Sequence, residues 1–168
     1  IITKTACIIP LVKESIKTDM NAWSYDENGW PSGFAGMKLL EDKNNHEKYL
    51  DKSINDKFDE KADAVYYLDG KKLKRVNKPC GDGTYVNVYI KTNPSVVDIL
   101  NKDIVRKFIE ITHERYKKEC GKEFGKAMKG FFTDEPQYYR WSTAYSPVLI
   151  PYFKDKYSID LWDEIGKL

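Results

Sequence analysis

The sequence predicts an α/β protein built from parallel βα units, with one inserted β-hairpin. Short runs rich in aromatic and β-branched residues alternate with amphipathic segments of helical spacing, as in parallel βα units. Two extended runs flank Asp69-Gly70, which is a strong local signal for a hairpin. Polar clusters directly follow the predicted core strands, and parallel α/β folds bind ligands at the carboxyl ends of their strands.

The first half of the chain is predicted to hold two helices, a strand and the hairpin. Alternation of side-chain type predicts the strand, and a dense run of Asp, Asn, Gly and Pro predicts the loop after it. The second helix depends on weak helical spacing of Leu39, Leu40, Tyr49 and Leu50. We expect a helix at 10–18, a strand at 20–25, a loop at 26–33, a helix early in 37–61, and hairpin strands at 64–68 and 71–76 within an insertion of about residues 63–77.

The second half is predicted to alternate strands and helices. Asn101 and Asp160 are expected N-caps, and Gly121 is expected to end the longest helix. Ser146-Pro147 is predicted to start another helix. We expect strands at 85–90 and 128–133, a short helix from Ser95, a long helix at 102–119, and helices after Pro147 and Asp160. The expected buried residues of these helices are Ile104, Val105, Phe108, Ile109, Thr112, Tyr116, Leu149, Ile150, Phe153 and Tyr157.

Composition limits the class of protein. The 168 residues fit one domain, and 28 Lys plus Arg against 26 Asp plus Glu argue against a nucleic-acid binder. No apolar run approaches the ~18–20 residues that span a bilayer. Three scattered cysteines favour reduced thiols in a cytoplasmic protein. The chain begins at Ile1 without an initiating Met, so a truncated N-terminus stays open as an alternative.

Three predicted strand ends carry side chains suited to a carbohydrate. If the strands are neighbours in one parallel sheet, these ends converge on one surface. Aromatic rings, 14% of the chain, stack on the apolar side of a sugar ring, and two carboxyl groups can cleave a glycosidic bond. The expected substrate-binding residues are Asp26, Glu27, Trp30, Asn93, Tyr138, Arg140 and Trp141, beside Asp134 and Glu135.

Each of these residues also has an ordinary structural interpretation. Asp26 and Glu27 can solvate a loop, Asn93 can start a helix, and Arg140 can neutralise nearby acids. His113 is expected to be structural and His46 to be solvated. The sequence has no phosphate-binding loop, no nucleophilic serine motif and no cysteine or histidine metal motif. The carboxylates are of the ligand type that Ca²⁺ takes, but they lack EF-hand spacing.

Residues 23–36, WSYDENGWPSGFAG, and residues 129–137, KGFFTDEPQ, together carry a resemblance. They resemble segments of large bacterial glycoside hydrolases related to the α-L-rhamnosidases of family 106. The resemblance implies part of a TIM (β/α)8 barrel that hydrolyses a glycosidic bond, with Glu135 as general acid. Asp134, the residue before Glu135, is expected to be the second catalytic residue, and it stands where sugar-cleaving barrels often have Asn. The family also implies an inverting mechanism with Ca²⁺ at the sugar, although acid/base cleavage itself requires no cofactor.

A closed barrel takes at least ~200 residues, so residues 1–168 are expected to form a partial catalytic domain from a larger protein. Unpaired strand edges then favour self-association, and the isolated chain is expected to be nearly inactive. The expected partner is a carbohydrate, with neither nucleic acid nor membrane. Two alternatives are a non-catalytic carbohydrate-binding module that uses Trp30, Tyr138 and Trp141, and a structural interaction module.

Overall fold

The computed structural model describes residues 2–26, 29–138 and 142–168, and side chains from residue 9 onward within these ranges. The chain divides into two compact units. The first unit comprises Ile1–His46 and Pro94–Gln137, and the second comprises Glu47–Asn93 and Tyr138–Leu168. Among the residues described, no helix is long and apolar enough to cross a membrane.

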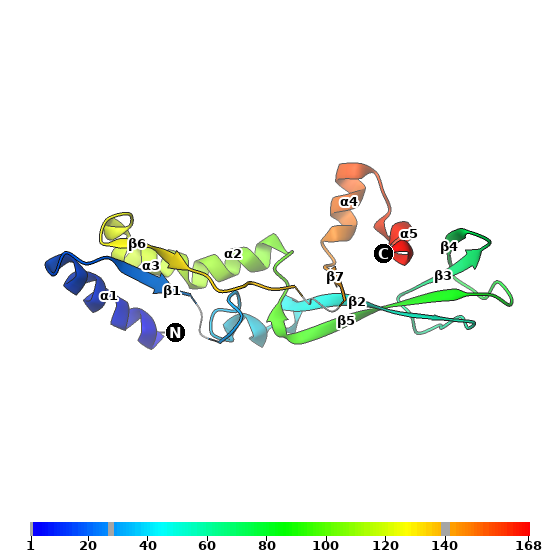
Figure 1. Cartoon of the computed structure of the whole chain (residues 1–168), viewed down its shortest axis with the longest axis horizontal. Coiled ribbons are helices and arrows are strands. Elements are labelled where there is room, and N and C mark those ends of the chain that lie inside the picture. Colours follow the sequence, from blue (N-terminus) through cyan, green and yellow to red (C-terminus); the bar gives the residue numbers. More distant parts are fainter. Residues whose placement is uncertain (1, 27–28, 139–141) are drawn as a thin grey trace. The chain divides into compact units, whose positions relative to one another are not determined.

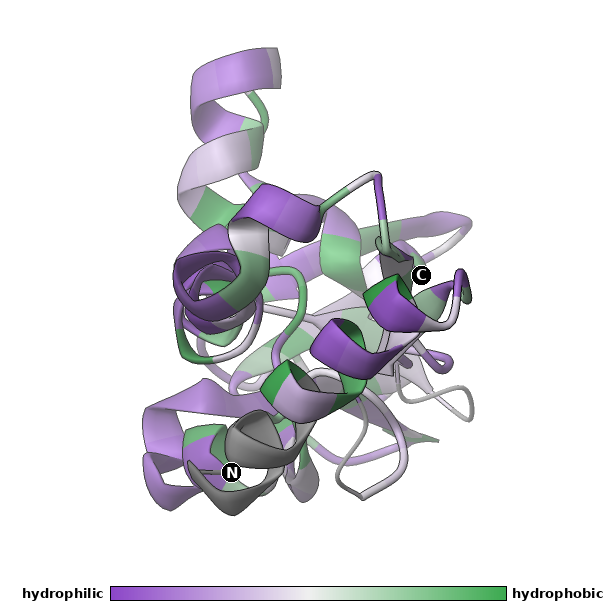
Figure 2. Cartoon of the chain, turned by 90° about the vertical axis from the view of Figure 1, so that its left-hand side faces the viewer, coloured by the Kyte–Doolittle hydropathy of each residue, from purple (hydrophilic) through white to green (hydrophobic). Residues whose placement is uncertain are grey.

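The first unit combines a two-stranded parallel sheet with helices. Its strands β1 and β6 lie side by side (Figure 1). Figure 2 shows hydrophobic patches interrupted by hydrophilic residues on the helices at this end of the chain. The elements are α1 (Ile2–Lys17), β1 (Ala22–Tyr25), α2 (Lys102–Ile111), α3 (His113–Cys120), β6 (Met128–Phe132) and the 3-10 helices η1 (Lys38–Glu41), η2 (Lys43–Asn45) and η3 (Gly121–Glu123).

The two faces of the β1–β6 sheet differ in burial. On one face, Met128 packs with Val12 and Cys120 in a small core. On the other face, Trp23 pairs with Gly130 in the strand register. A Cβ atom at Gly130 would come within 2.7 Å of the Trp23 ring, so only glycine lets the indole lie flat across β6.

The helix predicted at 102–119 is confirmed as helical, but it is not continuous, because the chain breaks at Thr112 into α2 and α3. Thr112 has φ −108° and ψ −80°, outside the helical region. Its hydroxyl donates a 2.6 Å hydrogen bond to the Phe108 carbonyl. A side chain that bonds back to the preceding turn in this way competes with the helix. Ile109, expected on the buried stripe, is 40% exposed.

The second unit is organised by a five-stranded sheet with the order β4-β3-β5-β2-β7. The pairs β3–β4, β3–β5 and β2–β7 are antiparallel. Tyr66, Val88 and Ile165 lie at the centre of its core. The elements are β2 (His46–Asn55), β3 (Ala64–Asp69), β4 (Lys72–Val76), β5 (Tyr85–Val97), β7 (Thr143–Tyr145), α4 (Leu149–Tyr157), α5 (Leu161–Glu164) and the 3-10 helix η4 (Ile165–Lys167).

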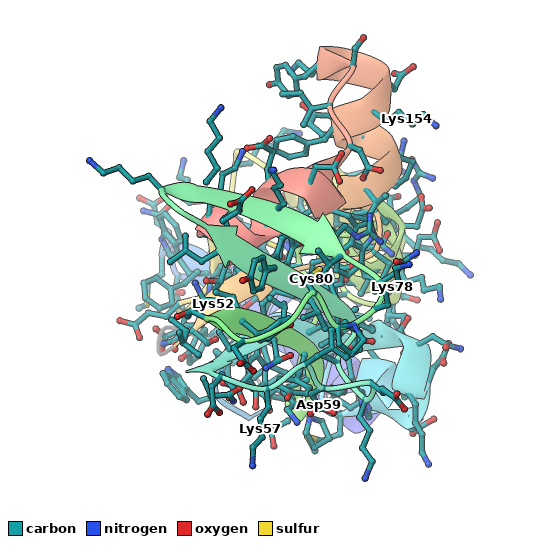
Figure 3. All side chains as sticks on the ribbon, turned by 90° about the vertical axis from the view of Figure 1, so that its right-hand side faces the viewer. Lys52, Lys57, Asp59, Lys78, Cys80 and Lys154 are labelled. Carbon is teal, nitrogen blue, oxygen red and sulfur yellow. The ribbon has the colours of Figure 1, made fainter. Side chains whose placement is uncertain are left out.

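A fully buried amide fixes the loop between β2 and β3. Asn87 on β5 accepts a 3.0 Å hydrogen bond from the Asp59 amide and donates a 2.9 Å bond to the Lys57 carbonyl. The loop residues Lys57 and Asp59 are labelled in Figure 3. The Tyr89 hydroxyl donates to the Asp59 carboxylate at 2.5 Å, and this bond lowers the pKa of Asp59. The loop is therefore tied to β5 through both backbone and side chain.

The predicted fold, parallel βα units forming part of a (β/α)8 barrel, is wrong. The larger sheet is antiparallel, and parallel pairing between named strands joins β1 to β6. The helix expected early in residues 37–61 is replaced by two 3-10 turns and the ten-residue strand β2. Within residues 46–97 no α-helix separates the strands. Parallel neighbours need such a crossover, so these strands pair antiparallel.

Some of the other local predictions are confirmed and others are wrong. The strands at β1 and β6 and the hairpin around Asp69-Gly70 are confirmed. Asn101 and Asp160 accept N-cap hydrogen bonds as expected, and α3 ends against Gly121. The helix expected from Ser95 is wrong, because β5 continues to Val97. The helix expected at Ser146-Pro147 starts two residues later, at Leu149. Tyr157 of that helix is 51% exposed, not buried.

We expect the stability of the second unit to fall as pH rises between about 10 and 12. Burial raises the pKa of Tyr66 from 10.0 to about 12, so the folded state holds the phenol proton more tightly than the unfolded state. The protonated Tyr66 phenol contributes its full stabilisation below pH 10. As pH rises to 12, the free energy of unfolding falls by at most about 2–3 kcal/mol. Urea denaturation monitored by circular dichroism would measure it.

The matched variants are Tyr66→Phe and Tyr67→Phe. Tyr66→Phe removes the hydroxyl that donates to the Trp162 carbonyl, so its stability at neutral pH falls, while its alkaline loss becomes smaller; the remaining loss comes from tyrosines such as Tyr145, whose pKa burial also raises. Tyr67 is only partly buried, and Tyr67→Phe should keep the wild-type pH dependence. An unchanged alkaline loss in Tyr66→Phe would rule out the assignment.

Candidate functional site

The carboxyl ends of β1 and β6 meet in the first unit. The Asp26 amide donates to the Phe132 carbonyl at 3.2 Å, which extends the parallel pairing by one residue. The Ser32 amide donates to the Asp134 carbonyl at 2.9 Å. Parallel pairing therefore brings Asp26 and Asp134, 108 positions apart in the sequence, to one edge of the sheet.

Asp26 is the buried organiser of this edge. Its side chain is 8% exposed. One carboxylate oxygen accepts a 2.6 Å hydrogen bond from the Ser32 hydroxyl, and the other accepts a 2.7 Å bond from the Thr133 hydroxyl. Ser32 Oγ in turn accepts from the Asp134 amide at 2.9 Å. Asp26 thus joins β1, the loop after it and the end of β6 in one hydrogen-bonded network.

Three exposed aromatic rings occupy the opposite face of the same strands. Trp23, Tyr25 and Phe132 are 67%, 47% and 57% exposed, and together they form what we call the aromatic face. Tyr25 and Phe132 pack edge to face, with ring centroids 5.3 Å apart. The Tyr25 hydroxyl donates to the Asp134 carboxylate at 2.7 Å. The aromatic face therefore leads directly into a carboxylate.

Glu135 follows with an exposed side chain and an unusual backbone. Its φ of 42° lies in the left-handed region, which costs a non-glycine residue about 1–3 kcal/mol. Gln137 donates to its carboxylate at 3.2 Å. Such conformations concentrate at functional sites, where the surrounding structure holds them in place.

The loop after β1 has the local conformation that its sequence requires. The Trp30–Pro31 peptide bond is cis, and Gly29 and Gly33 have φ values of 111° and 125°. In this loop Trp30 is 51% exposed, whereas Ser32 is only 3% exposed. Trp30 therefore lies on an exposed part of the loop whose next residues reach Asp26.

The remaining predicted site residues are not gathered here. Asn93 and Tyr138 belong to the second unit. The strand end predicted at Thr92-Asn93 is wrong, because Asn93 lies within β5 and donates to the buried Glu47 carboxylate at 3.0 Å. Glu27, Arg140 and Trp141 lie outside the residues that the structure describes.

The two histidines have structural roles. His113 packs against the rings of Phe108 and Phe131, with centroids 5.6 and 4.6 Å away, as predicted. The prediction that His46 is solvated is wrong. His46 is 8% exposed, and its Nε2 lies 3.0 Å from the Leu40 carbonyl oxygen.

Sequence reasoning gave no role to Tyr25 or Thr133, which hold the two aspartates. A signal was available for both. Side chains alternate along a strand, so Thr133 shares a face with Asp26 once the two strands pair. Tyr25 then falls on the same face as Asp134. The missing information was the register, which a single sequence does not provide.

Among the residues that the structure describes, the side chains at this edge are not arranged as a calcium site. No group of three or more His, Cys, Asp or Glu side chains is arranged to hold a metal ion in the described part of the chain. Both oxygens of Asp26 and one oxygen of Asp134 already accept hydroxyl hydrogen bonds. Ca²⁺ needs six to eight oxygen ligands, which these residues do not offer.

Comparison with protein-family models, curated proteins and solved structures finds no match to this chain. The chemistry of the site itself therefore indicates its function. The site offers the exposed aromatic face, the ordered carboxylate of Asp134 at the end of that face, and the exposed carboxylate of Glu135 one residue further on.

We expect Asp26→Ala to lower the free energy of unfolding by about 3 kcal/mol. The variant leaves the Ser32 and Thr133 hydroxyls without their charged acceptor, and hydrogen bonds to charged groups contribute about 1.5–3 kcal/mol each. The control is Asp103→Ala, which breaks an exposed ion pair with Arg106 and should cost less than about 1 kcal/mol. Urea titration of both variants measures the difference. Equal losses would show that the network does not stabilise this edge.

Proposed function

We propose that the first unit binds a carbohydrate and hydrolyses a glycosidic bond, with Glu135 as general acid. The observation that carries the proposal is the aromatic face, which ends at Asp134, the residue before Glu135. Aromatic rings present an apolar surface to the C–H side of a sugar, and carboxylates accept hydrogen bonds from its hydroxyl groups. The resemblance of residues 23–36 and 129–137 to hydrolases related to the family 106 rhamnosidases supports the same reaction.

The proposed reaction assigns separate roles to the three acids. Protonated Glu135 donates its proton to the glycosidic oxygen as the bond from the anomeric carbon to that oxygen breaks, and the leaving group departs as an alcohol. Water adds to the anomeric carbon, and a carboxylate takes its proton. Asp134 is the candidate for this second role, since both Asp26 oxygens are engaged in the buried network. Asp134 then releases its proton to solvent, and Glu135 takes a proton from solvent, which restores both acids.

A second candidate is carbohydrate binding without cleavage. The position of Trp23 favours it, because this ring lies two residues before Tyr25 on the same strand face. The aromatic face therefore extends along β1, away from Glu135, as a surface for further sugar units. In this case Asp134 and Glu135 act only as hydrogen-bond acceptors for hydroxyl groups.

The proposal requires no metal and no organic cofactor, and none of its steps passes through Ca²⁺. The two cysteines with described side chains, exposed Cys80 and buried Cys120, are free thiols. Free thiols are in keeping with the cytoplasmic location that we propose. Self-association through the open edges of the β1–β6 sheet belongs to the same proposal.

We expect Glu135→Gln to lower kcat at least ~100-fold on unactivated alkyl glycosides that the wild type cleaves. The amide keeps the shape of the side chain but has no proton to donate, and general acid catalysis contributes about 10²–10⁴-fold. The control is Glu110→Gln, an exposed position on α2, which should keep wild-type rates. Equal rates in Glu135→Gln and wild type would remove Glu135 from the mechanism. Sugar binding without turnover in the wild type would favour the second candidate.

We expect Trp30→Ala to weaken sugar binding about fivefold with little loss of stability. The Trp30 ring is half exposed. Its removal therefore takes away contact area for a ligand, worth about 1 kcal/mol of binding free energy, and little core packing. Tyr152→Ala removes a ring of similar exposure, 48%, from the second unit and serves as control. Calorimetric titration and urea denaturation separate the two effects. A large loss of stability in Trp30→Ala would place Trp30 in the core instead.

A further inference from the structure

An apolar pocket lies within the first unit beside the candidate acid. Its volume is about 150 Å³. Val97, Ile99, Val105 and Phe108 line it together with Gly33 and Pro136. The hydroxyl of Thr133 is directed to Asp26 by a 2.7 Å hydrogen bond. The walls that remain for a ligand are hydrocarbon.

The volume and lining define the kind of group that fits. An apolar cavity of about this size stays free of water and takes a single benzene ring. A sugar ring would leave several of its hydroxyl groups without hydrogen-bond partners against these walls, and each of these would weaken binding by about 30-fold or more. The pocket therefore suits one aromatic or aliphatic ring rather than a sugar.

The chain connectivity places this pocket next to the proposed chemistry. Thr133 and Pro136, which both line it, bracket Asp134 and Glu135 in the sequence. Gly33 follows Ser32, whose amide donates to the Asp134 carbonyl. A Cβ atom at Gly33 would lie 3.5 Å from Val97 Cγ2 and 3.8 Å from Ile99 Cγ2, which is ordinary contact distance, so the Gly33 backbone lies directly against these two lining side chains.

We propose that this pocket binds one apolar ring of the substrate, the leaving group of a glycoside whose glycosidic oxygen meets Glu135. The inference rests on the proposed function and names its substrate class, glycosides of aromatic or alicyclic alcohols. The pocket binds the ring, the sugar lies at the strand end where the aromatic face meets Asp134, and the bond between them is the one that Glu135 protonates.

Benzyl alcohol tests the pocket without any sugar. In ligand-observed NMR titrations, wild type and Glu135→Gln should bind it with the same Kd. Val105→Phe, which fills the pocket, should raise the Kd at least tenfold, and the smaller Val105→Met should give an intermediate increase. The control is Ile109→Phe, a 40% exposed residue of the same helix that does not line the pocket, and it should bind as wild type does. Circular dichroism establishes that each variant is folded.

Matched glycosides then test the link to catalysis. The wild type should prefer benzyl over methyl glycosides of the same sugar by about tenfold in kcat/KM, and Val105→Met should reduce that preference. Benzyl alcohol that does not bind, or that binds equally well to both Val105 variants, overturns the pocket assignment even where glycosides are cleaved. Benzyl alcohol binding that depends on Val105, with no glycoside cleaved, supports the ring pocket and overturns the proposed function instead.

Discussion

The buried carboxylate of Asp26 is the constraint on which the first unit depends. Its two hydroxyl hydrogen bonds reach residues 6 and 107 positions away in the sequence. A buried anion without such partners would be strongly destabilising, so the network forms only when β1, its loop and β6 are all in place. The positions of Asp134, Glu135 and the aromatic face follow from this arrangement, because each lies within a few residues of a hydrogen-bonded partner of Asp26.

The second unit depends on a different contact, between a ring and a backbone. Tyr66 is 1% exposed and donates through its hydroxyl to the Trp162 carbonyl. A Cβ atom at Gly166 would come within 2.5 Å of the Tyr66 ring. The C-terminal turn can therefore cover β3 only because residue 166 has no side chain. In this unit the sheet and the C-terminal helices stabilise each other mainly through packing, because the ion pair that joins them, Arg75 with Asp163 at 4.0 Å, is exposed.

Several local signals in the sequence were reliable, although those at Ser95 and Ser146-Pro147 were not, and elements that depend on distant partners could not be predicted. The caps at Asn101 and Asp160 and the turn at Asp69-Gly70 are set by neighbouring residues, and all three could be predicted. Strand β2 could not be, because the charged residues 46–55 become a strand only through pairing with β5 and β7. The meeting of Asp26 with Asp134 follows from simple pairing of strand ends. The prediction that Asn93 ends a strand at the site was wrong, because β5 continues to Val97.

The left-handed backbone of Glu135 sets stability against chemistry at one position. The residues that adopt a φ of 42° most readily are glycine and asparagine, and neither carries an acid. Glutamate here costs part of the folding free energy and places a carboxylate on an exposed turn. Selection for heat resistance alone would favour losing the carboxylate, whereas selection for turnover would retain it. Glu135 is therefore the residue that the proposed function needs and that stability alone would replace.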